Sequence, residues 1–149
     1  MNAPAHIITE KDLHEEALAR TRERCRVAVL TMRALPDCHA KHLYHSLASG
    51  MPEYLRTDGD YPPAISIKFK PTAEQVTDCF DVFDAFAWYK RSHVTGDRDL
   101  KIILWRAIKL PWWVIGQHLN IGRSDRTIQR YYDGAISRIQ TKLEGPNVA

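Results

Sequence analysis

The stretch that decides the fold is residues 110–139, LPWWVIGQHLNIGRSDRTIQRYYDGAISRI, where apolar residues recur at helical spacing on both sides of a short break. Pro111 stands where the first helix opens, a position that tolerates proline because the first N–H groups of a helix have no partner within it. Val114, Ile115 and Leu119 give that helix an inner face. The stretch therefore begins with a short predicted helix that packs through one apolar side.

A turn and a second helix follow. Gly116 leaves room for two helices to cross closely, Asn120 readily adopts a left-handed conformation, and Ile121 fills the angle between the helices. Ser124 is a preferred N-cap. The predicted inner positions of the second helix are Ile128, Tyr132, Ala135, Ile136 and Ile139. Two short helices joined in this way are typical of the DNA-reading helix-turn-helix.

The first turns of the second helix carry side chains that suit DNA readout. Arginine fits the O6 and N7 acceptors of guanine, glutamine fits adenine, and the helix N-terminus attracts phosphate. Lys109 and Arg123 flank this helix as contacts to the DNA backbone. Tyr131 is open between a phosphate contact and core packing. The predicted DNA-binding residues are Lys109, Arg123, Ser124, Arg126, Thr127, Gln129 and Arg130.

Charge is divided unevenly along the chain. The 149 residues carry 21 Lys and Arg against 18 Asp and Glu, a net charge of +3. Residues 98–149 hold nine basic and four acidic residues, whereas residues 1–97 hold twelve and fourteen. A local basic surplus favours a polyanionic partner, chiefly nucleic acid. We accordingly expect residues 1–97 to form a helical scaffold with a partner or dimer surface, and residues 98–149 to form a DNA-binding module.

Composition limits the class of protein. With 44% hydrophobic and 26% charged residues, the chain suits one compact domain rather than a disordered or collagenous protein. Its three cysteines form no Cys-x-x-Cys pair, and their odd number suits a reducing compartment. No apolar run approaches the ~20 residues of a membrane span, and the first residues lack the plan of a signal peptide. These features predict a cytoplasmic protein that makes no membrane contact.

The start of the chain predicts a long amphipathic helix. Thr9 is a suitable N-cap, and the Leu35-Pro36 pair ends the helical pattern. The expected inner positions are Leu13, Ala17, Thr21, Cys25, Ala28, Val29 and Met32. The flanks mix arginine with glutamate, which favours a solvated face over a phosphate-binding strip because the acids would oppose DNA.

Proline and glycine interrupt any long period in residues 36–71, which predict a loop-rich connector. Residues 65–70 alternate apolar and polar but have no partner strand, so we expect an extended segment packed on helices.

Another helix is predicted after this connector. Thr72 and Gln75 match a capping box, which marks its start. Its expected inner positions are Val76, Cys79, Phe80, Phe83, Phe86, Ala87 and the stem of Lys90.

Asp97 or Asp99 is expected to cap a further helix of about three turns. The inner stripe of that helix is predicted to be Leu100, Ile103, Leu104 and Ala107. The whole pattern predicts an all-α domain of about five helices that ends in a helix-turn-helix.

Several segments together resemble a known family. They are RALP at 33–36, PTA at 71–73, WY at 88–89, RDL at 98–100, LWRA at 104–107, PWWVI at 111–115, TIQR at 127–130 and AISRI at 135–139. In these segments the chain resembles a family of small phage- and prophage-associated proteobacterial proteins of unknown function that end in a helix-turn-helix. The resemblance implies a helical fold and a DNA-binding C-terminal module, but no reaction or target. Residues 122–126 are longer than the usual turn, which leaves open whether Arg123, Arg126 or Gln129 faces a base.

Other constellations in the chain favour ordinary surface roles. Cys38 and His42 have a spacing that zinc ligands use on a helix, but a fourth ligand is not evident. Asp78, Asp81 and Asp84 lie on consecutive turns, too far apart to share one ion, and predict a solvated or partner-facing acidic face. Because phosphate-cradling glycine loops and known catalytic motifs are missing, we expect no catalytic residue, metal or cofactor, and no enzyme activity.

These observations lead to three functional hypotheses. The first is a phage-related transcription regulator that binds double-stranded DNA as a dimer, since paired half-sites raise the limited affinity of one module. The second is a small phage DNA-packaging recognition subunit, expected as a ring. The third is an adaptor whose acidic face or helix-turn-helix contacts polymerase or another host protein; Trp113 is then a candidate for contact with the partner.

Overall fold

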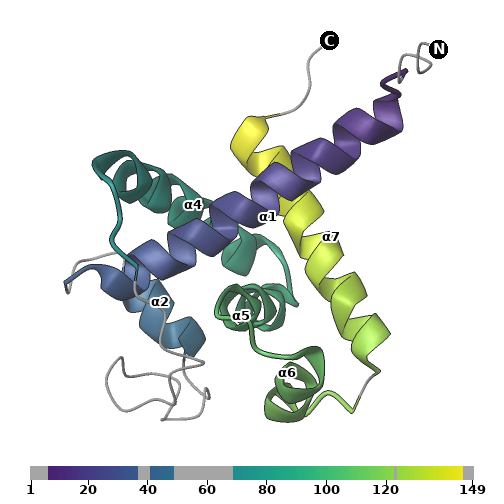
Figure 1. The fold of residues 1–149 in the computed structure, drawn as a ribbon. Coiled ribbons are helices and arrows are strands. Elements are labelled where there is room, and N and C mark those ends of the chain that lie inside the picture. The colour runs from purple at the N-terminus through teal and green to yellow at the C-terminus, as the bar shows by residue number, and fades with distance from the viewer. Residues whose placement is uncertain (1–6, 37–40, 49–68, 123, 146–149) are drawn as a thin grey trace.

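The computed structural model describes residues 7–36, 41–48, 69–122 and 124–145, and these residues form six helices without a strand among them (Figure 1). The helices are α1 (Glu10–Ala34), α2 (Lys41–Ala48), α4 (Ala73–Ser92), α5 (Gly96–Ala107), α6 (Trp112–Leu119) and α7 (Asp125–Glu144). The all-α class is confirmed. In the described part of the chain there are six helices rather than the expected five or so, because α2 forms within the segment predicted as a connector.

Helix α1 begins and ends where the sequence predicts. Thr9 accepts a hydrogen bond from the Asp12 backbone N–H at 3.2 Å, and the Asp12 carboxylate accepts one from the Thr9 N–H at 2.9 Å, which completes a capping box. Leu35 ends the helix in an extended conformation. The expectation that Leu13 lies on the inner face is wrong, because the first turns of α1 extend beyond the other helices and leave that side chain 55% exposed (Figure 1).

Helix α2 corrects the prediction of an irregular connector. Its eight residues bury Tyr44, Leu47 and Ala48 against the core, so tertiary packing stabilises a helix too short to persist alone. The Lys41 ammonium donates to the backbone carbonyl of Leu35 at the end of α1. Residues 49–68, with most of the segment predicted to be extended, lie outside the described residues.

The capping box of α4 is confirmed. Thr72 accepts from the Gln75 N–H at 3.2 Å, and the Gln75 side chain accepts from the Thr72 N–H at 2.9 Å. Phe80, however, is 40% exposed, so its predicted inner position is wrong. Cys79, Phe83 and Phe86 are buried as predicted, and the buried face extends to Val82 and Tyr89 because α4 packs against α1 on one side and against α5 and α7 on another.

Helix α5 occupies the centre of the bundle, where it contacts each of the other five helices that the structure describes. Leu100, Ile103, Leu104 and Ala107 are buried as predicted, and Trp105 is buried with them. The prediction that Asp97 or Asp99 caps this helix is wrong: Thr95 is the N-cap residue and makes no side-chain capping bond. The chain turns closely at Gly96, where a Cβ would lie 2.7 Å from the Tyr89 carbonyl oxygen.

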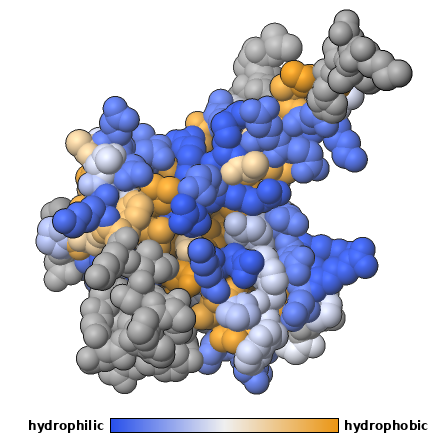
Figure 2. Space-filling model, viewed as in Figure 1, coloured by the Kyte–Doolittle hydropathy of each residue, from blue (hydrophilic) through white to orange (hydrophobic). Residues whose placement is uncertain are grey.

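Buried side chains from all six helices form one hydrophobic cluster. In Figure 2, hydrophobic residues show at the centre of the visible face, and hydrophilic residues cover much of α1 and the outer side of α7. Within the described residues, none of the helices combines the length and the apolar character that crossing a bilayer requires.

Candidate nucleic-acid interface

Helix α6 is held by its apolar side and ended by a left-handed residue. Pro111 is the N-cap residue (φ −60°, ψ 149°), so the helix starts one residue later than predicted. Ile115 is fully buried, and Leu119 packs against the core from a half-buried position. Asn120 has φ 53° and ψ 39°, which confirms the left-handed turn, and the Ile121 N–H that follows donates to the Gly116 carbonyl at 3.4 Å.

Helix α7 starts at its predicted cap. The Ser124 hydroxyl accepts from the Thr127 N–H at 3.4 Å and lies 3.1 Å from the Thr127 hydroxyl. Four of the five predicted inner residues, Ile128, Ala135, Ile136 and Ile139, are fully buried. The fifth, Tyr132, is half-buried and packs against the core. One stripe of α7 is therefore committed to the core, and the opposite side of its first turns faces solvent.

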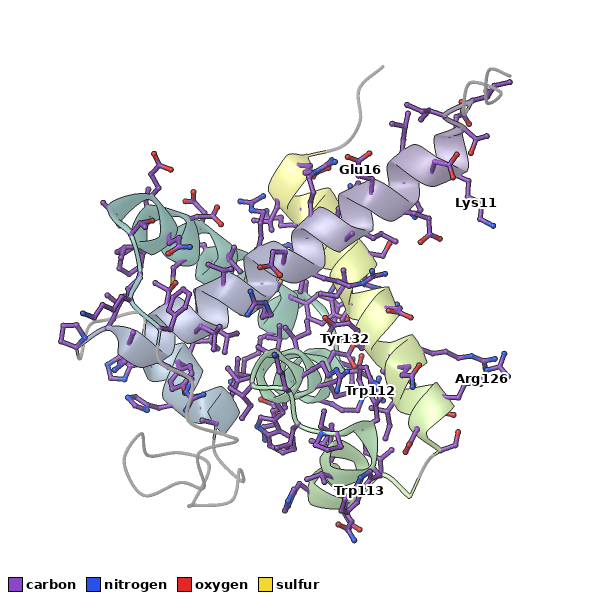
Figure 3. All side chains as sticks on the ribbon, in the orientation of Figure 1. Lys11, Glu16, Trp112, Trp113, Arg126 and Tyr132 are labelled. Atoms are coloured by element: carbon purple, nitrogen blue, oxygen red, sulfur yellow. The ribbon has the colours of Figure 1, made fainter. Side chains whose placement is uncertain are left out.

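Aromatic and cationic contacts hold α6 in place. The Trp112 ring meets the Tyr132 ring edge-on, with centroids 5.4 Å apart, which joins α6 to α7. The Arg106 guanidinium lies 4.5 Å from the centroid of the Trp112 ring and also donates to the Leu110 carbonyl at 3.0 Å. Figure 3 shows Trp112 and Tyr132 on the side of α7 that faces α5. The start of α6 is thus tied to both neighbouring helices.

A buried polar network holds the second half of α7. The Asp99 side chain is 2% exposed and accepts from the Tyr89 hydroxyl at 2.6 Å and from Arg98 at 2.9 and 3.0 Å. Arg138 of α7 donates to the Tyr89 hydroxyl at 2.9 Å. Burial, together with the hydrogen bond to Asp99, raises the pKa of Tyr89. The network connects α4, α5 and α7 through one carboxylate.

Sequence reasoning missed this network, although a signal was present. Asp99 precedes Ile103 and Ala107 at intervals of four residues, which places it on the inner stripe rather than at the cap.

Tyr131 packs against a neighbouring helix. The Arg98 guanidinium lies 3.7 Å from the centroid of the Tyr131 ring. Tyr131 is half-buried against the core beneath it, so the alternative of core packing is the one the structure supports for that ring.

The predicted DNA-contacting side chains of α7 occupy its outer, first turns. Arg126, Gln129 and Arg130 are exposed, and Thr127 is half-buried at the cap. Figure 3 shows Arg126 extending away from the other helices. Among the described residues, Arg126 and Arg130 form no ion pair or side-chain hydrogen bond. Both guanidinium groups are therefore available to an external anion.

The remaining predicted contacts are placed differently. Lys109 is exposed and has φ 64°, but it lines a cavity with Tyr132, on the side of α7 that packs towards α1 and α5. Arg123 lies outside the described residues. The structure thus gathers Ser124, Arg126, Thr127, Gln129 and Arg130 on one helix start, and it gives Lys109 separate surroundings.

Helix α6 adds an exposed aromatic beside this helix start. Trp113 is 61% exposed, whereas Trp105 is buried and Trp112 is half-buried. With Gln117 and Asp125, Trp113 lines a shallow depression of about 350 Å³ between α6 and the start of α7. Trp113 therefore points outward, as its candidacy for a partner contact requires.

Arg24 and Arg26 of α1 are paired with carboxylates within the molecule. Arg24 binds both carboxylate oxygens of Asp78, at 2.6 and 3.3 Å, and this hydrogen bonding raises its pKa. Arg26 binds Glu23 in the same bidentate manner, which lowers the pKa of that glutamate. Because Asp78 is engaged with α1, the predicted acidic face of α4 is reduced to Asp81 and Asp84.

The cysteines and histidines form no metal cluster within the described part of the chain. Cys38 of the zinc alternative lies outside that part, whereas His42 is on α2. Cys25 and Cys79 are buried thiols that take part in no disulfide, and the Cys79 thiol donates to the Ala28 carbonyl at 3.3 Å. Burial raises the pKa of the Cys25 thiol to about 12, so the group stays protonated at neutral pH.

Comparison with known proteins assigns no family to the chain. No protein-family model, curated protein or solved structure matches it. The resemblance to a phage-associated family therefore stays a prediction.

Proposed function

We propose that α6 and α7 form a helix-turn-helix that binds double-stranded DNA, with the first turns of α7 in the major groove, and that the protein is a phage-related transcription regulator. The observation that carries this proposal is the state of Arg126 and Arg130. Both are exposed at the start of a capped helix whose opposite stripe is buried, and neither has an ion-pair partner among the described residues.

The chemistry of this helix start suits a nucleic acid. Arg126, Gln129 and Arg130 offer donors for guanine, adenine and phosphate, and no internal ion pair needs to be broken before the two arginines bind. The positive end of the α7 helix dipole lies at its N-terminus and favours a nearby phosphate. Asp125 and Asp133 are also exposed on the N-terminal half of α7, and their negative charges repel phosphate and so weaken non-specific binding to polyanions.

The rigid surroundings support readout of bases rather than loose attraction. The contact of Trp112 with Tyr132 and the buried bonds of Asp99 hold α6 and α7 against α5. Side chains on a fixed helix lose less conformational entropy on binding than side chains on a loop. The sequence preference of binding is therefore expected to depend on α7, and non-specific affinity on its two arginines.

The experiment measures binding to random duplex DNA and to the DNA upstream of the protein's own gene across a series of salt concentrations. We expect preference for one sequence and affinity that falls steeply with salt. Arg126→Ala and Arg130→Ala are each expected to weaken binding about tenfold, and to lower the log–log salt slope by about 1 where a phosphate contact is lost. Arg20→Ala removes the same charge from α1, where Arg20 is paired, and is expected to bind as the wild type does.

Two outcomes would count against this function. A folded sample that binds no DNA at low salt excludes it, and so does an equal loss of affinity in the Arg20→Ala control. Sedimentation of the protein with and without DNA tests the expected dimer on two half-sites. A monomer in both cases removes the dimer from the proposal, and a ring moves the function to DNA packaging.

A further inference from the structure

A second basic feature lies away from the start of α7, in a cavity of about 310 Å³ between α1, α5 and α7. Four cationic side chains and one carboxylate line it: Arg22, Arg26, Arg106, Lys109 and Glu23. Its floor includes Cys25 and Tyr132. The volume falls at the lower end of the range typical of small-molecule sites.

The internal partners of these charges leave an excess of free donors. Glu23 and Arg26 bind each other bidentately at 2.6 and 3.0 Å, so they largely cancel. Arg106 uses one N–H on the Leu110 carbonyl, and a guanidinium has five. Among the described residues, the side chains of Arg22 and Lys109 form no ion pair or hydrogen bond. Three cations thus face the cavity without a compensating carboxylate in its lining.

The Tyr132 hydroxyl adds a neutral donor to the cavity lining. The Tyr132 ring packs edge-on against Trp112, and within the described residues its hydroxyl forms no hydrogen bond, so it is available to a bound molecule. Burial raises the pKa of Tyr132 to about 12, so the hydroxyl is a proton donor at neutral pH. The neighbouring Cys25 thiol also stays protonated and brings no negative charge. The Tyr132 hydroxyl is therefore a hydrogen-bond donor to an anion bound in the cavity.

We propose that this cavity is a binding site for a small phosphoryl anion, of the phosphate-ester or pyrophosphate class. Arg22, Arg106 and Lys109 supply the charge, and the Tyr132 hydroxyl donates to a phosphoryl oxygen. Three uncompensated cations match a dianion better than a monocarboxylate, and the guanidinium groups suit bidentate phosphate binding. The site is separate from the proposed DNA-reading face and does not depend on that function.

Binding of an anion in the cavity is expected to change the environment of Trp112 at the start of α6. Arg106 lies over the Trp112 ring, and Tyr132 touches the same ring from α7. An anion that draws Arg106 and the Tyr132 hydroxyl together changes the surroundings of this indole. Tryptophan fluorescence is thus expected to change on binding, and this gives a second measurement of binding that does not depend on the heat recorded by calorimetry.

The test titrates the protein with inorganic pyrophosphate at constant ionic strength, by calorimetry and tryptophan fluorescence. We expect saturable binding that weakens at least tenfold in Arg22→Ala and about fivefold in Tyr132→Phe, a change that removes only the hydroxyl. Lys109→Ala, an exposed substitution, gives a second measure of the charge contribution. Arg20→Ala is the matched control, on the same helix but outside the cavity lining, and is expected to bind as the wild type does. Absence of saturation, or an equal loss in Arg20→Ala, overturns the proposal.

A second arm separates a free phosphoryl anion from a phosphate of the DNA backbone. The pyrophosphate titration is repeated with a saturating short duplex. Unchanged pyrophosphate affinity, with DNA affinity preserved in Arg22→Ala, supports a site for a free anion. Displacement of pyrophosphate by the duplex, with DNA affinity lost in Arg22→Ala, overturns it and assigns the cavity to the DNA backbone. If no DNA binds at all, the first arm still decides the cavity proposal.

Discussion

The paired arginines of α1 and the arginines at the start of α7 share one chemistry but have opposite surroundings. Arg24 and Arg26 each bind a carboxylate at 2.6 Å, whereas Arg126 and Arg130 have no ion-pair partner among the described residues. A guanidinium that is already paired gains little from a second anion, since the first ion pair must be loosened. A count of basic residues therefore does not locate a polyanion site; the pairing of each one does.

The two ends of α7 repeat this contrast within one helix. Arg138 belongs to the polar network around buried Asp99, whereas Arg126 extends away from the bundle (Figure 3). The first arginine is used to hold the fold, and the second is available to a ligand. Substitution of each kind of arginine is expected to separate stability from binding.

The largest effect is expected from Asp99→Ala. It leaves the Tyr89 hydroxyl buried without its acceptor, and it leaves Arg98 and Arg138 without their carboxylate. We expect the free energy of unfolding to fall by about 3 kcal/mol, measured by urea denaturation. Asp97→Ala, which removes a carboxylate that is 49% exposed, is the control and is expected to cost less than about 1 kcal/mol. Equal losses would contradict the role given to the network.

Alkaline pH is expected to destabilise the protein through Cys25, whose side chain is buried on the inner face of α1. Its thiol has a pKa of about 12 in the folded state, against an ordinary value of 9.0. Above pH 9 the unfolded chain loses this proton and the folded chain keeps it, so stability is full below pH 9 and falls as the pH rises towards 12. Between pH 9 and 10 the loss is expected to be about 1 kcal/mol.

Denaturation at pH 8, 9 and 10, for the wild type and for Cys25→Ala, measures this effect. The substitution removes the thiol, so the variant is expected to show a shallower fall in the free energy of unfolding. Parallel pH dependence of the two proteins would show that the burial of Cys25 does not govern its titration.

Removing one paired arginine is expected to have a smaller effect on stability. Arg24→Ala breaks the half-exposed bidentate bond to Asp78 and is expected to cost about 0.5–1 kcal/mol in unfolding free energy. The double variant with Asp78→Ala is expected to lose less than the sum of the two single losses, because both remove the same bond. Strict additivity in this double-mutant cycle would contradict the pairing. DNA affinity is expected to remain unchanged.

The smallest stability effect is expected from Arg126→Ala. The side chain is exposed and has no internal partner, so unfolding free energy is expected to change by less than about 0.5 kcal/mol. The same variant is expected to lose DNA affinity about tenfold, as proposed above. A variant as unstable as Arg24→Ala, with normal DNA binding, would reverse the comparison between the two regions.

Local features were the most predictable part of the fold. Thr9, Thr72 and Ser124 cap helices as predicted, and Asn120 takes the left-handed conformation expected of it. Each depends on hydrogen bonds or backbone sterics within a few residues, which do not require the rest of the chain. The exposed positions of α7 followed from the same short-range periodicity.

Features that depend on distant neighbours were mispredicted. Leu13 is exposed because the first turns of α1 extend beyond the bundle, and Phe80 is exposed because the helices that pack on α4 cover its neighbours Phe83 and Tyr89 but not this position. Asp99 suits a cap by its residue type but turns inward to Tyr89 and Arg98. Helix α2 has a weak local signal and is stabilised by the core that it covers.

The sequence by itself therefore determined the all-helical class, the boundaries of the capped helices, the left-handed turn after α6 and the basic start of α7. These properties arise from short-range hydrogen bonding, backbone sterics and periodicity. Only the tertiary structure decided that Arg24 is paired with Asp78, that Asp99 is buried, and that Arg22, Arg106 and Lys109 meet around one cavity. Such groupings join residues far apart in the chain, and ion pairing and burial depend on distances in space that spacing along the sequence does not encode.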